Sequence, residues 1–230
     1  MRIAGLLAAA ALVAACSHSV PGEPESTAES SAPPTPPTGR TTTTPAPSAA
    51  PAPGSSAPAA GASIDEVVRF VEAAAPADAG TYGVAFRDGV TTRLDGGLAF
   101  TAPSGEPHGA TQCLTTADGL TCLAELTSPP PSPGGEGVWK PGWIDFPGTE
   151  VRIGALRGDP GPFVNGSGAE LPAGQSLAFA DDRCRSDPAG LFCVNYAHRS
   201  AVLISAAGVV PFGCLQPAPP AAGIGAALRC

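Results

Sequence analysis

The chain has 230 residues, 28 of them proline and 29 glycine, and a formal net charge of −8 at pH 7. This acidic balance, with no basic cluster interleaved with aromatic residues, argues against a nucleic-acid partner, because neutralising phosphates requires such a cluster. The chain has eleven arginines and one lysine, Lys140. This preference for arginine, together with the abundant Ala, Gly and Pro, is typical of a high-GC genome.

The amino-terminal apolar run, from Ile3 to Val13, has eleven residues, far fewer than the roughly 20 that a membrane-spanning helix needs. Arg2 and the small residues that follow are typical of a secretory signal peptide, predicted here over residues 1–15. The stretch Val13-Ala14-Ala15-Cys16 resembles the lipobox of bacterial lipoproteins. This resemblance implies cleavage before Cys16, lipidation of its thiol, and attachment to the cell membrane on the side facing the periplasm and cell wall. With the composition, it indicates an actinobacterial source.

Residues 16–63 are predicted to form a lipidated, disordered stalk. From Ser17 to Ser63 the chain has eleven prolines and no aromatic residue. Such a segment buries too little apolar surface to offset the entropy lost on ordering.

Residues 64–230 are predicted to form one extracytoplasmic domain, with 17 acidic and 10 basic residues. Its first element is an amphipathic helix. Ser63 and Glu66 have the spacing of a capping box, apolar residues recur at helical spacing from Ile64 to Ala75, and Pro76 marks the end.

The rest of the domain reads as short β-strands separated by turns. Apolar stretches are found at 82–86, 90–94, 98–101, 120–126, 151–156, 177–180, 191–196 and 201–204, and a loop is predicted at 128–137. The fold class we predict is α+β, mostly β, with one amino-terminal amphipathic helix packed on small antiparallel sheets.

Six cysteines follow Cys16. Cys113 to Cys122 and Cys184 to Cys193 both read C-x5-G-L-x-C, and each is preceded by Leu-Ala-Phe. The repeated pattern predicts two disulfide-closed hairpins and an internal duplication, with Cys214 pairing Cys230 by elimination among the fifteen possible connectivities. The eight-residue spacing does not suit a zinc site.

Much of the domain resembles a family of actinobacterial lipoproteins, the mycobacterial Lpp type. The residues that carry the resemblance are 87–92, 99–103, 143–146, 159–163, 171–174 and 190–196. The resemblance implies an exported lipoprotein with paired disulfide hairpins, and it carries over no catalytic residues.

No catalytic constellation stands out. A serine hydrolase would need Ser200 or Ser205 beside His198, or a nucleophile beside His108, yet no GxSxG motif occurs. Asp181-Asp182 is either a calcium ligand pair or, as we favour, a turn at a strand end. Asp145 and Glu170 have no identified partner for acid–base chemistry. We therefore expect no catalytic residues, no metal and no cofactor.

Trp139 and Trp143, in the segment Trp-Lys-Pro-Gly-Trp, are the candidate ligand-binding residues. In a Pro-rigidified loop two indoles can stack on sugars or form a protein hot spot; the alternative, which we favour, is packing in the core.

Together these features predict a membrane-anchored envelope lipoprotein that acts as a non-enzymatic binding or interaction module for a cell-wall glycan, a lipid or an envelope protein. An envelope hydrolase or its accessory, and a purely structural lipoprotein, are the alternatives.

Overall fold

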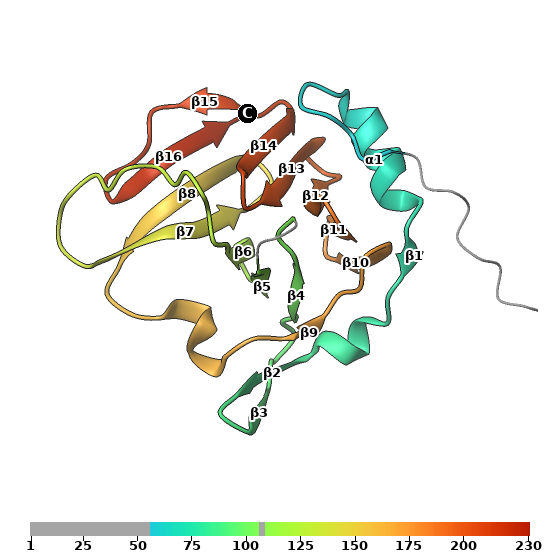
Figure 1. The fold of residues 1–230 in the computed structure, drawn as a ribbon, viewed down its shortest axis with the longest axis horizontal. Helices are drawn as coiled ribbons and strands as arrows, with labels where there is room; N and C mark the ends of the chain where they lie inside the picture. Colours follow the sequence, from blue (N-terminus) through green and yellow to red (C-terminus); the bar gives the residue numbers. More distant parts are fainter. Residues whose placement is uncertain (1–55, 106–108) are drawn as a thin grey trace, which may run out of the picture. The chain divides into compact units, whose positions relative to one another are not determined.

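β-Strands make up most of the domain in the computed structural model, which describes residues 56–105 and 109–230 (Figure 1). The prediction of a mostly β domain with one amino-terminal helix is confirmed. The helical elements are α1 (Ile64–Glu72), η1 (Ala79–Tyr82) and η2 (Gly161–Asn165). The strands are β1 (Ala75–Pro76), β2 (Val84–Arg87), β3 (Val90–Arg93), β4 (Ala99–Pro103), β5 (Ala110–Thr116), β6 (Gly119–Leu123), β7 (Val138–Phe146), β8 (Glu150–Arg157), β9 (Ala169–Glu170), β10 (Gln175–Phe179), β11 (Asp182–Asp187), β12 (Gly190–Asn195), β13 (Ser200–Ser205), β14 (Gly208–Gly213), β15 (Gln216–Ala218) and β16 (Ile224–Arg229).

Helix α1 begins where the capping box predicts. The Ser63 side chain accepts a hydrogen bond from the Glu66 backbone N–H at 3.3 Å. The helix ends at Glu72, three residues before the predicted end, because Ala75 and Pro76 pair with β10 as a short strand. Neither α1 nor any other helix in the described residues is long and apolar enough to cross a bilayer.

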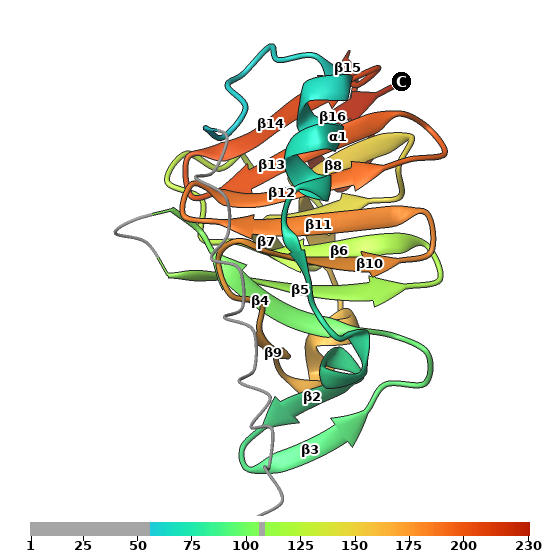
Figure 2. The same cartoon turned by 90° about the vertical axis from the view of Figure 1, so that its right-hand side faces the viewer.

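The helix packs across the outer face of the six-stranded sheet (Figure 2). Phe70 meets Phe192 edge-on, with ring centroids 4.9 Å apart. From β11, Arg185 donates a 2.6 Å hydrogen bond to the Phe70 carbonyl, and its guanidinium lies 3.6 Å from the Phe70 ring centroid. This contact satisfies a carbonyl near the helix end and fixes the helix to the sheet.

Two sheets face one another. One has the order β1-β10-β11-β12-β13-β14 and the other the order β15-β16-β8-β7-β6-β5-β4-β9, while β2 and β3 form a separate hairpin. In each large sheet five consecutive strands follow one another as an antiparallel meander, β4 to β8 in one and β10 to β14 in the other.

Two short parallel pairings, which the sequence does not predict, link the halves of the chain. Ala75 in β1 pairs with Gln175 in β10, and Phe100 in β4 pairs with Ala169 in β9. Strand β1, which precedes the first meander, is therefore an edge strand beside the second. Strand β9, which precedes the second meander, is an edge strand beside the first.

The core lies between the two sheets and contains four of the cysteines. Cys113 is bonded to Cys122 and Cys184 to Cys193, and all four are fully buried among apolar residues of both sheets. In each case the bonded residues lie directly opposite one another on adjacent strands, β5 with β6 and β11 with β12. The prediction of disulfide bonds is thus confirmed, and a third joins two exposed residues, Cys214 and Cys230.

The segment from Trp139 to Trp143, predicted as a loop, lies within β7. Lys140 pairs with Ala155 and Ile144 with Ile153, so that three residues of β7 oppose Gly154 alone. This bulge explains the error, because Pro has no N–H for a regular ladder and is tolerated where pairing is interrupted.

Candidate functional site

The turns at one end of the two sheets surround a hollow of about 710 Å³. Its charged lining consists of Asp118 from the β5–β6 turn, Glu150 and Arg152 from β8, Asp181 from the β10–β11 turn, Asp182 from the start of β11, and His198 from the β12–β13 turn. With four carboxylates and one arginine, it is here called the acidic cleft.

Asp182 and Asn195 form a buried polar part of this lining. Their exposed fractions are 7 % and 5 %, and the Asn195 amide donates to Asp182 Oδ1 at 2.9 Å. The Asn195 carbonyl oxygen accepts from the His198 backbone N–H at 3.0 Å, which fixes the amide orientation. Burial has the largest effect on the pKa of Asp182 and raises it. The hydrogen bond from Asn195 and the nearby His198 lower this pKa, whereas the charge of Asp181 raises it further.

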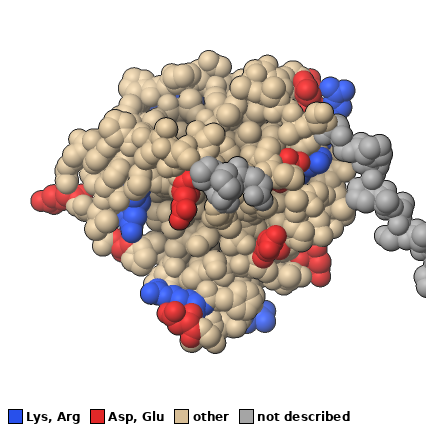
Figure 3. Space-filling model, in the orientation of Figure 1, with Lys and Arg blue, Asp and Glu red and all other residues tan. Residues whose placement is uncertain are grey.

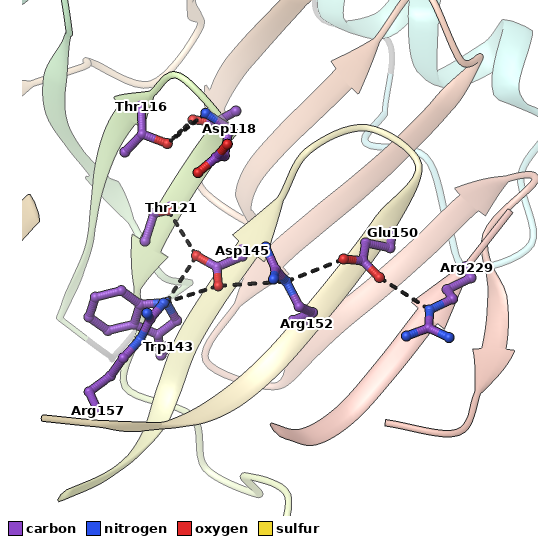
Figure 4. A network of polar contacts seen from close by, with 10 residues as sticks. Thr116, Asp118, Thr121, Trp143, Asp145, Glu150, Arg152, Arg157 and Arg229 are labelled. Carbon is purple, nitrogen blue, oxygen red and sulfur yellow. Dashed lines mark hydrogen bonds and ion pairs between the residues drawn. The ribbon is translucent and has the colours of Figure 1, made fainter. Parts of the chain in front are cut away.

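A second hollow, of about 250 Å³, lies over the outer faces of β6, β7 and β8 and is here called the arginine hollow. At its centre Asp145 accepts hydrogen bonds from Thr121 Oγ1 at 2.8 Å, Trp143 Nε1 at 2.9 Å and Arg157 Nη2 at 3.2 Å (Figure 4). Arg157 also lies 4.0 Å from the centroid of the Trp143 ring. The guanidinium is therefore oriented by both a carboxylate and an aromatic ring.

The ion pairs continue from Asp145 along the sheet. Arg152 lies 3.8 Å from Asp145 and 3.4 Å from Glu150, and Arg229 lies 3.1 Å from the other Glu150 oxygen (Figure 4). This ladder of alternating charges holds three arginines and two carboxylates, so it has one positive charge in excess.

The acidic cleft and the arginine hollow adjoin one another. Both are lined by Thr116, Asp118 and Arg152. On the face shown in Figure 3, charged side chains occur singly or in small groups, and some of these groups hold both signs.

The two candidate tryptophans lie in different surroundings. Trp143 is 2 % exposed, and its ring meets Phe163 edge-on at 5.3 Å, so it packs in the interior, the alternative that the sequence favoured. Trp139 is partly exposed, and its indole lies against Gly154 and Gly225 with Pro130 beside it. The Trp143 side chain is thus unavailable for stacking on a sugar, whereas Trp139 presents some surface.

The hydrolase candidates are not assembled into a triad among the described residues. The Ser200 hydroxyl donates to the Gly148 carbonyl and the Ser205 hydroxyl to the Gly208 carbonyl. His198 lies in the β12–β13 turn and contributes its backbone N–H to Asn195. His108 and the predicted lipidation residue Cys16 lie outside the described residues.

The carboxylates that the sequence suggested as candidates lie in a turn, at a strand start and within two strands. Asp181 belongs to the β10–β11 turn and Asp182 starts β11, which is the turn at a strand end that we favoured. Asp145 is enclosed by its donors, and Glu170 is exposed in β9. Over residues 56–105 and 109–230, no group of three or more His, Cys, Asp or Glu side chains is arranged to hold a metal ion.

Sequence reasoning missed Asp118, Glu150, Arg152 and Arg157. They come from a turn and a strand that are separate in the chain, and only the fold brings them around the two adjoining hollows. The alternation of Glu150 and Arg152 in β8 is the one local signal that they share a sheet face.

Comparisons of the chain with protein-family models, with curated proteins and with solved structures give no match. The resemblance to mycobacterial Lpp-type lipoproteins stays a prediction.

Proposed function

We propose that the protein is a lipoprotein of the cell envelope, anchored through Cys16 and carrying a non-enzymatic binding module on a stalk. The support for the anchor is the lipobox-like Val13-Ala14-Ala15-Cys16 after a short apolar run. Residues 1–15 are the signal peptide, and the domain faces the periplasm and cell wall.

The acidic cleft is the binding site that we propose for this module. The observation that carries the proposal is the buried pair Asp182 and Asn195, held by hydrogen bonds in the wall of an open hollow. A carboxyl group that lies buried in the wall of a cleft, with its pKa raised by burial and by a neighbouring charge, is typical of a functional site. The lining is charged and polar, which suits a cell-wall component or an envelope protein better than a lipid tail.

We also propose that the two meanders arose by internal duplication, each with a disulfide-closed hairpin. Three features support the equivalence of β4 to β8 with β10 to β14: the C-x5-G-L-x-C pattern in both, opposed cysteines at the same strand positions, and glycines with positive φ three residues before the second cysteine, Gly119 and Gly190. The Leu-Ala-Phe triplets do not share this equivalence, because Phe100 lies opposite Cys113 whereas Leu177 lies opposite Cys184.

The anchor is tested by metabolic labelling with a palmitate analogue and by cell fractionation. The full chain should take up label and sediment with membranes, and a Cys16→Ser variant should lose both properties. A Cys16→Ser chain that remains labelled would contradict the anchor.

The binding module is tested with the full chain carrying Cys16→Ser, which is free of the proposed lipid. We expect it to co-sediment with purified cell-wall sacculi, and Asp182→Asn to weaken this binding. Asp88→Asn is the matched control, because Asp88 pairs with Arg87 at an exposed hairpin and lines neither hollow. Equal binding by all three chains would exclude the acidic cleft, and hydrolysis of the sacculi that is lost on replacing His108 and His198 would favour an envelope hydrolase.

A further inference from the structure

We infer that the acidic cleft and the arginine hollow form one continuous site for a zwitterionic ligand, whose ammonium group binds at Asp182 and whose carboxylate binds at Arg152 and Arg157. This inference rests on the proposed function and specifies the ligand chemistry of the same site. It follows from the carboxylates that line the acidic cleft and the guanidinium groups that the adjoining arginine hollow presents to solvent.

The ammonium end is defined by Asp182. This side chain is more than nine-tenths buried and lines the cleft, and only its Oδ1 is held, by Asn195. Its Oδ2 has no hydrogen-bond or ion-pair partner among residues 56–105 and 109–230. Asp181 stands beside it, and Asp118 and Glu150 line the same cleft. An ammonium group brings three donors and one positive charge, which matches an acceptor-only carboxylate in an acidic surrounding.

The carboxylate end is defined by the two arginines that flank Asp145. The Arg152 and Arg157 side chains are 36 % and 34 % exposed, whereas the Asp145 side chain is 10 % exposed. The hollow therefore presents guanidinium groups to solvent rather than the carboxylate between them.

These guanidinium groups also keep free donors. In the described part of the chain, Arg152 meets carboxylates only through Nε, and Arg157 donates to Asp145 only through Nη2. The remaining Nη donors offer the planar fork that binds a carboxylate through two parallel hydrogen bonds.

The two ends belong to one surface because Arg152, Asp118 and Thr116 line both hollows. A ligand with a single charge would meet only one end favourably. A ligand with an amino group and a carboxyl group, such as an amino acid or a peptide with a free end, would meet both.

The test is isothermal titration calorimetry of the full chain carrying Cys16→Ser with ω-amino acids of increasing length: glycine, 4-aminobutyrate and 6-aminohexanoate. Hexylamine and hexanoate are the matched probes that lack one charge each. At least one ω-amino acid should bind about tenfold or more tightly than both single-charge probes, since each charged hydrogen bond contributes that order of affinity. If no ω-amino acid binds more tightly than both, the inference is overturned.

Variants assign the two ends. Asp182→Asn, which retains an oxygen for the Asn195 amide, should weaken binding of the ω-amino acid and of hexylamine about tenfold and leave hexanoate unchanged. Arg157→Gln should weaken the ω-amino acid and hexanoate and leave hexylamine unchanged, and Arg152→Gln serves the same purpose if Arg157→Gln fails to fold. Arg229→Gln is the control, because it removes an arginine from the same ladder but lines neither hollow. An equal effect of Arg229→Gln would contradict the assignment.

The inference and the proposed function fail in different ways. Sacculus binding that depends on Asp182 but is not displaced by any ω-amino acid would overturn the zwitterionic ligand and leave the binding module standing. Absence of both sacculus binding and probe binding would overturn both.

Discussion

Burial, rather than loop length, should decide which disulfide stabilises the domain most. The bonds Cys113–Cys122 and Cys184–Cys193 each close a separation of 9 residues, and Cys214–Cys230 closes 16. From the entropy of loop closure alone, a shorter loop contributes about 2.6 kcal/mol and the longer one about 3.1 kcal/mol, so that the exposed bond should rank first.

The packing of the sulfur atoms reverses this order. Cys113, Cys122, Cys184 and Cys193 are 0 % exposed, and removing one buried heavy atom costs about 1 kcal/mol, by analogy with Ile→Val. Replacing both members of a buried pair with Ala should therefore lower the free energy of unfolding by about 4.6 kcal/mol, against about 3.1 kcal/mol for the exposed pair.

The assay is urea unfolding of three double variants, C113A/C122A, C184A/C193A and C214A/C230A, in the full chain carrying Cys16→Ser under non-reducing conditions. The slope of the free energy against urea concentration must be compared as well, because losing a crosslink also changes the unfolded state. A loss in C214A/C230A equal to or larger than that in the buried pairs would refute the burial argument.

Three further predictions test local features. Gly119→Ala should destabilise the domain more than Gly208→Ala, although both glycines have positive φ. The reason is that a Cβ added at Gly119 would lie 2.7 Å from the Phe146 carbonyl oxygen, whereas one added at Gly208 would meet nothing within 4 Å. Equal thermal unfolding midpoints of the two variants would contradict the close approach at Gly119. Burial raises the pKa of Asp182, so the folded chain loses stability as the pH rises from the ordinary carboxyl range, about pH 4, toward this higher pKa. Over that interval Asp182→Asn should gain stability relative to the wild-type chain, and a pH-independent difference in urea unfolding would argue against burial as the cause. Mild reduction of the native Cys16→Ser chain should release two thiols, from the exposed Cys214–Cys230 bond, before the others react; release of all six together in a thiol-labelling time course would contradict this order.

Local patterns in the sequence predicted the elements whose signals are contained within a few residues. The capping box at Ser63 gives the start of α1, and Arg87-Asp88-Gly89 gives the turn between β2 and β3. Strand β14 was missed because Gly208, Pro211 and Gly213 read as turn residues, although Pro is tolerated there on the edge of a sheet.

The candidate site could not be predicted because its residues are brought together by the fold alone. Asp182 gave only a turn signal, and its burial depends on Asn195, which follows it by thirteen residues across a hairpin. Arg157 is oriented by Asp145 and Trp143 from the neighbouring strand. Side-chain spacing along one segment contains no information on such contacts between turns and strands.

The reciprocal pairing of β1 with β10 and of β9 with β4 has a consequence for the time course of folding. Ala75 cannot pair until Gln175 has been synthesised. At ribosomal rates of about 5 to 20 residues per second this takes about 5 to 20 seconds more. The hairpin closed by Cys113 and Cys122 needs only neighbouring residues and can form without any distant part of the chain. The first meander can therefore form as an incomplete sheet, whose β4 edge is covered only once β9 pairs with it.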